Sequence, residues 1–274
     1  MTRPIRQIAA RFRRAATLAA VAGSMALLSP VSAQDAPQSE AQTSTGPTLD
    51  GPFNAAERKA IRNLVRNYIL ENPEIIPEAV QILRERQKQA KTEQQQAAVK
   101  TQETALNDPG MLPVLGNPEG DVTVVEFFDY NCPYCRGITK QLIETVRADG
   151  NVRLILKELP ILRESSRTAA RAAVAAAQQG AYAEFHERLM TKVQGISEDS
   201  IMALAERMEL DTAQLQADMT ARATEKYLSE TQRLARDLQI GGTPAFVVGG
   251  ELVSGAIGRE RLEDLIAQAR ERES

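Results

Sequence analysis

The only two cysteines of the chain stand three residues apart, at Cys132 and Cys135. The apolar run 122–128 leads directly into them, and a segment that can form a helix, residues 137–146, follows. A Cys-x-x-Cys pair between a strand and a helix is typical of a redox-active dithiol, because a helix N-terminus favours the attacking thiolate. The spacing therefore predicts that this chain exchanges electrons with the disulfides of other proteins.

Other interpretations of the cysteine pair are weaker. A structural zinc site needs four nitrogen or sulfur ligands, and His186 is the only histidine in the chain. A structural disulfide across two intervening residues would close too small a loop to remove much chain entropy. Two unrelated buried thiols would have no reason to flank Pro133. We therefore expect a redox dithiol with no metal and no cofactor.

Two charged residues lie in apolar runs near the cysteines. Glu126 lies six residues before Cys132, inside the predicted strand 122–128. A buried carboxylate without a partner is costly, so Glu126 either faces solvent or has a function in the core. Lys157, on the next predicted strand, is the candidate partner of Glu126. For His186 we favour a packed or surface position on a helix over a Cys–His nucleophile pair.

The first 33 residues have the pattern of an export signal. Five arginines precede the apolar stretch 15–28, and residues 31–33 (Val-Ser-Ala) fit a small-residue cleavage site. The short stretch disfavours the alternative of an uncleaved membrane anchor. Export of a protein with an exchange dithiol predicts a disulfide-forming compartment, most simply a bacterial periplasm.

The mature chain is acidic. Residues 1–33 hold five arginines and no acidic residue, so their removal takes the formal net charge from −3 to −8. An acidic chain without a basic stripe is a poor partner for nucleic acid. Residues 34–51, rich in Gln, Ser, Thr, Pro and Ala, are predicted to form a disordered linker.

Residues 52–106 are predicted to be helical. Apolar residues recur at helical spacing over 54–71, Asn54 is a candidate N-cap, and Pro73 separates this helix from a second one. The second helix begins with an apolar stripe and becomes almost wholly polar after Leu83. Two short amphipathic helices cannot bury their stripes alone, which predicts a homo-oligomer through residues 53–83. The alternative is packing onto the chain's own catalytic domain.

Residues 107–274 carry the pattern of an α/β domain. We expect a turn-rich hinge over 107–120, with a short strand at residues 114–115. Further strands are expected at 122–128, 151–159, 243–248 and 251–253. A helical block over about 164–238 separates the last two strands from the others, and a closing helix is expected at 259–270.

These residues resemble the thioredoxin superfamily, in its DsbA-like branch, over about residues 110–272. The resemblance rests on residues 126–128 (Glu-Phe-Phe), residues 132–135 (Cys-Pro-Tyr-Cys), the helical block, and Thr243-Pro244 before a strand. The segment 68–74 (Tyr-Ile-Leu-Glu-Asn-Pro-Glu) resembles the oligomerisation segment of the ScsC group of periplasmic disulfide isomerases and copper-tolerance proteins. The resemblance implies a thioredoxin-like fold preceded by a small all-helical oligomerisation segment.

The resemblance also implies roles for individual residues. Cys132 would attack a client disulfide, Cys135 would resolve the mixed disulfide, and Glu126 would relay protons to Cys135. Pro244 would be cis and face the dithiol, instead of forming an ordinary trans turn. Thr243 would leave its backbone free to pair with a substrate strand.

Several functions remain open on the sequence alone. Tyr134 takes a position where related oxidases often carry a histidine, and a neutral side chain there should make the dithiol less oxidising. We therefore expect an isomerase or reductase that acts on client proteins with cysteines or disulfides and is reset by a membrane redox partner. The alternatives are a dithiol oxidase, a Cu(I)-binding copper-tolerance protein, and an envelope interaction protein whose dithiol is incidental.

Overall fold

The computed structural model describes residues 53–273. The expected export signal, residues 1–33, and the expected linker, residues 34–51, lie outside the described residues. The chain divides into two compact units, with the boundary at Asn67 inside the first described helix.

The described residues begin with the two predicted helices, α1 (Ala55–Glu71) and α2 (Ile75–Thr101). Asn54 caps α1, because its Oδ1 accepts hydrogen bonds from the backbone N–H groups of Ala56 and Glu57, each at 3.0 Å. The two helices are interrupted around Pro73, as expected, since the residue before a proline is disfavoured in a helix. A short helix, α3 (Glu103–Asn107), follows α2.

One mixed sheet organises the catalytic domain, in the strand order β1-β3-β2-β4-β5. The central strands β2 and β3 run parallel, and the other neighbouring pairs are antiparallel. The bounds are β1 (Leu115–Gly116), β2 (Val122–Phe128), β3 (Val152–Glu158), β4 (Ala245–Val248) and β5 (Glu251–Ser254). All five strands lie where the sequence pattern predicts them, to within two residues.

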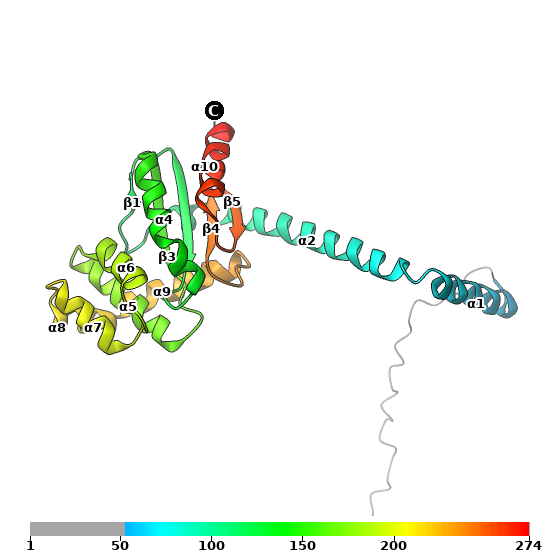
Figure 1. Cartoon of the computed structure of the whole chain (residues 1–274), viewed down its shortest axis with the longest axis horizontal. Coiled ribbons are helices and arrows are strands. Elements are labelled where there is room, and N and C mark those ends of the chain that lie inside the picture. The colour runs from blue at the N-terminus through cyan, green and yellow to red at the C-terminus, as the bar shows by residue number, and fades with distance from the viewer. Residues whose placement is uncertain (1–52, 274) are drawn as a thin grey trace, which may run out of the picture. The chain divides into compact units, whose positions relative to one another are not determined.

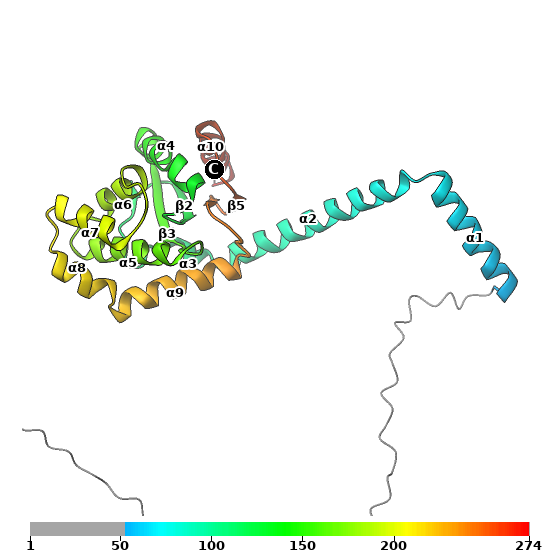
Figure 2. The same cartoon turned by 60° about the horizontal axis from the view of Figure 1, so that its bottom comes forward.

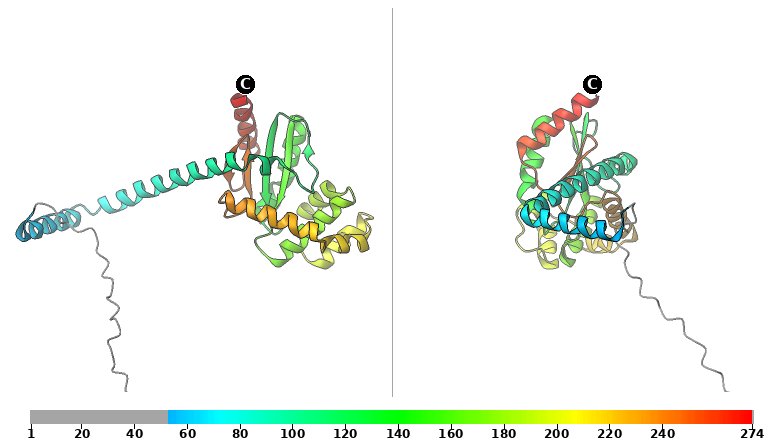
Figure 3. Two further views of the ribbon diagram at one scale, coloured as in Figure 1. Left: turned by 180° about the vertical axis from the view of Figure 1, so that it is seen from behind. Right: turned by 90° about the vertical axis from the view of Figure 1, so that its right-hand side faces the viewer.

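Helices cover both faces of the sheet, and each face has its own apolar core. Figure 1 shows α4 (Pro133–Asp149) and α10 (Arg259–Glu273) on one side, and Figure 3 shows α9 (Arg222–Asp237) on the other. Alternate residues of β2 serve the two cores: Val124 and Phe128 pack on the α4 side, while Val125 and Phe127 pack on the α9 side. This explains why β2 is a nearly continuous apolar run.

The predicted helical block is confirmed as an insertion between β3 and β4. Its members are α5 (Glu164–Gln178), α6 (Tyr182–Thr191), α7 (Glu198–Arg207), α8 (Thr212–Met219) and α9. Figure 2 shows α6, α7 and α8 gathered beyond one end of the sheet, while α9 returns toward α2. Seven buried residues of α5 are alanine or valine, which allows the neighbouring helices to approach it closely.

The expectation of a hinge over residues 107–120 is wrong. Within this segment Leu112 is buried, β1 pairs with β3, and the backbone N–H of Asn117 donates to the Val152 carbonyl at 2.9 Å. Arg153 also binds the Asn107 carbonyl through Nη2 at 2.9 Å. The prolines and glycines that suggested a hinge form fixed turns of the catalytic domain.

The C-terminal end of α2 also belongs to the catalytic domain. Val99 and Leu106 are buried in the core on the α9 side of the sheet. Gln95 donates through Nε2 to the Gln239 carbonyl at 3.1 Å, just after α9 ends. Contacts with the core of this domain therefore extend back to about residue 95, a dozen residues before the expected boundary at 107.

This boundary predicts the outcome of two truncations. A chain that begins at residue 91 should keep the stability of the catalytic domain. A chain that begins at residue 107 loses two buried apolar side chains, which should lower the free energy of unfolding by about 3–6 kcal/mol. Denaturant unfolding of both chains measures the difference, and equal unfolding midpoints would contradict this boundary.

Candidate active site

The cysteines lie where β2 passes into α4. β2 ends at Phe128, and Cys132 is the N-cap residue of α4, with φ −75° and ψ 116°. Pro133 occupies the start of the helix, where its missing N–H costs nothing and its fixed φ suits the first turn. Cys132 therefore faces the unpaired N–H groups at the positive end of the helix dipole.

The sulfur of Cys132 contacts two backbone groups. It accepts a hydrogen bond from the N–H of Cys135 at 3.5 Å, and its thiol donates to the Thr243 carbonyl at 3.2 Å. Both cysteines are free thiols, and Cys132 is 3% exposed. The N–H of Cys135 can also donate to a negatively charged sulfur, whereas the bond to the Thr243 carbonyl needs the thiol hydrogen.

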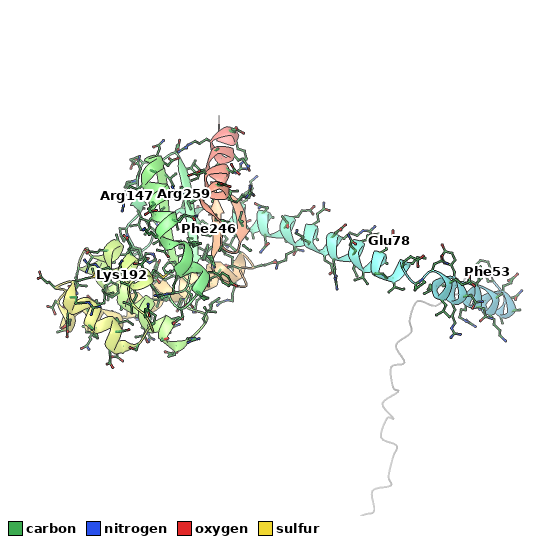
Figure 4. All side chains as sticks on the ribbon, viewed as in Figure 1. Phe53, Glu78, Arg147, Lys192, Phe246 and Arg259 are labelled. Atoms are coloured by element: carbon green, nitrogen blue, oxygen red, sulfur yellow. The ribbon has the colours of Figure 1, made fainter. Side chains whose placement is uncertain are left out.

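Thr243, which contacts Cys132 through its carbonyl, comes from a distant part of the chain. The Thr243–Pro244 peptide bond is cis, as the family resemblance implied, and β4 begins at the next residue. Phe246 of β4, labelled in Figure 4, pairs with Glu126 of β2, so the register of this antiparallel pair brings the proline loop to the end of β2.

Cys135 differs from Cys132 in its surroundings. It has no exposed surface, because α4 turns it toward the sheet. Burial raises the pKa of the Cys135 thiol well above its ordinary value, and the nearby Glu126 carboxyl raises it further. Cys135 therefore needs a base close by before it can act as a nucleophile.

Glu126 is buried and faces the α4 side of the sheet. Its side chain is 1% exposed, and neither carboxyl oxygen has a hydrogen-bond partner among the described residues. Burial raises its pKa from 4.5 to about 8. A carboxyl with a pKa in this range can accept and return a proton near neutral pH.

The expected pairing of Lys157 with Glu126 is wrong. In the parallel register of β2 and β3, Glu126 lies beside Leu156 and Phe127 lies beside Lys157. Because successive side chains of a strand point to opposite faces, Lys157 and Glu126 are on opposite sides of the sheet. The Nζ atom of Lys157 instead donates to the Ala105 and Asp108 carbonyls at the end of α3.

Tyr134 and Arg136, which flank Cys135, differ in their exposure to solvent. Tyr134 is 69% exposed. The guanidinium of Arg136 is partly buried and donates to the carbonyls of Tyr130, Leu189 and Val193. Arg136 therefore ties the first turn of α4 to the end of α6.

Asp129 was not recognised from the sequence, although it directly follows β2. Its side chain is buried, and Oδ1 accepts the N–H of Asn131 at 2.7 Å. Oδ2 accepts the N–H groups of Ile161 and Leu162 at 2.9 and 3.0 Å. Asp129 thus joins the segment before Cys132 to the loop after β3.

A second buried acid, Glu158, was also missed. Glu158 is the last residue of β3, and Glu126 lies near the end of β2. This similar position in the two strands is the signal in the sequence that could have identified Glu158. His186 lies buried on α6, which is the packed of the two helix positions expected for it. Its Nδ1 lies 3.1 Å from the Tyr130 hydroxyl. Burial lowers the pKa of His186 to about 3, so its ring is neutral.

The described residues contain no group of three or more His, Cys, Asp or Glu side chains that could hold a metal ion. They also include no helix long and apolar enough to cross a membrane. A mixed sheet of this order, with Cys-Pro-Tyr-Cys at a helix start and a cis-proline before β4, is the arrangement of the thioredoxin-like class of folds.

Comparison with known families agrees with this class. Residues 123–267 match the DSBA-like thioredoxin domain, and residues 57–90 match the N-terminal domain of the copper resistance protein ScsC. The first match covers more than half of the chain, and the chain belongs to the DSBA-like thioredoxin family.

Solved structures show the same fold. A thioredoxin-like oxidoreductase from Silicibacter pomeroyi is 49% identical, covering 61% of this chain and 95% of that one, with a TM-score of 0.58. Proteus mirabilis ScsC in a transitional conformation is 31% identical, covering 79% and 98%, with a TM-score of 0.58. Salmonella enterica BcfH is 27% identical, covering 78% and 96%, with a TM-score of 0.67.

The curated relatives include larger proteins. The Na(+)/H(+) antiporter NhaA 1 of Salinispora arenicola is 30% identical over 164 residues, which are 59% of this chain and 25% of the antiporter. The chain therefore spans about a quarter of the length of such relatives. The thiol:disulfide interchange protein DsbA of Bordetella pertussis is 22% identical over 150 residues, which are 53% of this chain and 71% of that protein.

The buried Glu126 predicts a specific pH dependence of stability. Its raised pKa means that the native state holds a proton that the unfolded state releases between pH 4.5 and about 8. The free energy of unfolding that Glu126 contributes therefore falls as the pH rises through this interval. Glu126→Gln should gain stability relative to wild type over the same interval, by on the order of a few kcal/mol at pH 8.

Denaturant unfolding of both proteins from pH 4.5 to pH 8.5 measures this gain. A stability difference that stays constant across the interval would contradict a buried, unpaired Glu126.

Proposed function

We propose that this chain is an exported disulfide isomerase or reductase that works as a homo-oligomer through residues 53–83. The observation that carries the proposal is the combination of two features in one chain. One is the Cys132–Cys135 dithiol at the start of α4. The other is a pair of N-terminal helices whose apolar side chains are exposed.

The exchange would begin at Cys132. Its thiolate attacks one sulfur of a client disulfide, so that a Cys132–client disulfide forms and the other client sulfur leaves as a thiolate. For reduction, Cys135 then attacks Cys132, which closes the internal disulfide and releases the second client sulfur as a thiolate. Two electrons pass from the dithiol to the client. For isomerisation, a different thiolate of the client attacks the client sulfur of the mixed disulfide, so that a new client disulfide forms and Cys132 leaves as a thiolate.

Glu126 would take the proton from Cys135 in the reductive route. Cys135 cannot easily ionise, because burial and the Glu126 carboxyl both raise its pKa. Glu126 is itself buried without a hydrogen-bond partner among the described residues, so a proton can reach it without breaking an existing hydrogen bond. In the reverse reaction the same carboxyl returns the proton to Cys135.

The direction of exchange follows from what surrounds the attacking sulfur. Cys132 has hydrogen bonds to two backbone groups and none to a cationic side chain within the described residues. Tyr134 is neutral and largely exposed. Without a positive side chain to stabilise the thiolate, the reduced form is less favoured and the dithiol is less oxidising, which suits isomerisation or reduction.

Exposed apolar side chains at the N-terminus support the homo-oligomer. No residue of α1 is buried, although Leu64, Tyr68 and Leu70 are apolar or aromatic and more than half exposed. In α2, Ile76 and Leu83 are also half exposed. A second copy of the same helices would cover this surface, and an oligomer would hold several dithiols near one client.

The surface beside the dithiol suits an unfolded or misfolded client. Ile161 and Leu162 are 46% and 49% exposed, and Asp129 holds their backbone next to the segment that carries Cys132. Tyr134 adds a large exposed ring. Together these side chains offer an apolar surface to client segments that are themselves apolar.

The compartment completes the proposal. The export pattern of residues 1–33 would deliver the mature chain to the periplasm, where disulfides persist. A dithiol that turns over there needs a membrane redox partner to reset it. The match of residues 57–90 to the ScsC N-terminal domain supports a place for this chain in the ScsC group of the family.

A second candidate function is Cu(I) binding, which is favoured by the match to a copper resistance protein. Two thiolates suit Cu(I), because soft sulfur ligands select it. If the chain binds Cu(I), the reduced protein should take one Cu(I) from a competing chelator. The variant Cys132→Ser should lose that binding. Failure of the reduced chain to compete would remove the candidate.

The isomerase proposal predicts that activity depends on oligomer formation. The reduced mature chain should refold a protein with scrambled disulfides, and Leu64→Glu should lower that activity at least several-fold by placing a charge on the exposed apolar surface. The matched control is Asn63→Glu, which adds the same charge to α1 at a residue that is already polar.

Simple reduction of a small disulfide should stay unchanged in Leu64→Glu, since the dithiol is intact. Analytical ultracentrifugation should show that Leu64→Glu alone lowers the mass of the assembly. Full isomerase activity in a monomeric Leu64→Glu protein would overturn the oligomer part of the proposal, and activity limited to oxidation would favour the oxidase.

A further inference from the structure

Four aromatic residues form a buried cluster, and two of them contact the carboxyl of Glu158. Phe128 and Tyr130 come from the end of β2 and the segment after it, while Tyr182 and His186 come from α6. The Phe128 ring packs edge-on against both Tyr130 and His186, with ring centroids 5.1 and 4.8 Å apart. Tyr182 and His186 stack with centroids 5.8 Å apart.

Two hydroxyls of this cluster meet at one carboxyl oxygen. The Tyr130 and Tyr182 hydroxyls both donate to Oε1 of Glu158, each at 3.0 Å. His186 Nδ1 lies 3.1 Å from the Tyr130 hydroxyl. Glu158, Tyr130, Tyr182 and His186 are each 1% exposed, so these bonds are shielded from competing water.

Glu158 acts here as a hydrogen-bond acceptor for two hydroxyls. Burial raises its pKa well above the ordinary value, and Asp129 and Glu126 raise it further, while the two phenols lower it. A neutral carboxyl still offers a carbonyl oxygen that accepts two hydrogen bonds.

The cluster lies next to the segment that presents the attacking sulfur. Tyr130 is two residues before Cys132, and the N–H of Cys132 donates to the Asp129 carbonyl at 3.0 Å. The Tyr130 carbonyl accepts a hydrogen bond from Arg136 of α4 at 3.2 Å. Tyr130 is therefore held through both its backbone and its hydroxyl, and Glu158 holds the hydroxyl.

We infer that Glu158 is a positioning residue for the dithiol, because its carboxyl ties the Tyr130 hydroxyl, and with it the segment carrying Cys132, to α6 of the helical insertion. The inference rests on the proposed role of Cys132 as the attacking thiol. It is independent of whether the protein acts as an isomerase, a reductase or an oxidase.

The test compares Tyr130→Phe with Tyr182→Phe in the full mature chain. Each variant removes one hydroxyl that donates to the same oxygen over the same distance, and only Tyr130 belongs to the segment that carries Cys132. Tyr130→Phe also removes the contact with His186 Nδ1, so His186→Phe is compared as well, and it should leave both readouts within about twofold if Glu158 holds the hydroxyl. Two readouts need no client: the alkylation rate of Cys132 as a function of pH, and the equilibrium of the dithiol with glutathione. Both can succeed or fail whatever the outcome of the isomerase assay.

Tyr130→Phe should slow the alkylation of Cys132 at neutral pH and shift the glutathione equilibrium toward the disulfide. The reason is that a released segment holds the sulfur less well at the N–H of Cys135, which stabilises the thiolate. The expected change is about twofold to tenfold, the factor that corresponds to the net free energy of one hydrogen bond. Tyr182→Phe should leave both readouts within about twofold of their wild-type values. Its loss of thermal stability should be similar to that of Tyr130→Phe.

Glu158→Gln provides the matched control for charge. The amide keeps an oxygen that can accept both hydroxyls, so this variant should behave like wild type in both readouts. The inference is overturned if Tyr130→Phe and Tyr182→Phe change the two readouts equally. It is also overturned if Glu158→Gln shifts them as far as Tyr130→Phe does, because the carboxyl would then act through its charge.

Discussion

The sulfur of Cys132 stands where a helix normally has a capping oxygen, and the site depends on this position. The N–H groups of the first turn of α4 have no partners within the helix, so they favour negative charge on the sulfur. For the cap to form, β2 must end at Phe128 and pass into α4 within four residues. The Thr243 carbonyl of the cis-proline loop then reaches the same sulfur from β4.

The buried acids show the cost of this arrangement. Glu126 and Glu158 lie near the ends of the two central strands, on the same side of the sheet, where carboxylates are poorly solvated. Glu158 is satisfied by two phenols, whereas Glu126 has no hydrogen-bond partner among the described residues. An unsatisfied carboxyl opposes folding, so stability does not explain the burial of Glu126 near Cys135, whereas the proposed proton transfer does.

Much of the fold could be predicted because its signals are local. The strand 122–128, the cap at Asn54 and the helical insertion each depend on neighbouring residues. The errors arose where a contact joins distant parts of the chain. Lys157 was assigned to Glu126 because the register that separates them is not visible in either strand alone. Residues 107–120 looked like a hinge because their partners lie in β3, and Glu158 was missed because Tyr182 lies 24 residues away.

The central claim is that Cys132 attacks the client and Cys135 stays inside. Trapping of mixed disulfides tests it most directly, with Cys135→Ala and Cys132→Ala compared on a client that contains one disulfide. The account predicts that Cys135→Ala accumulates a covalent adduct through Cys132, since no resolving thiol remains, and that Cys132→Ala forms none. An adduct through Cys135, or equal adducts in both variants, would contradict it.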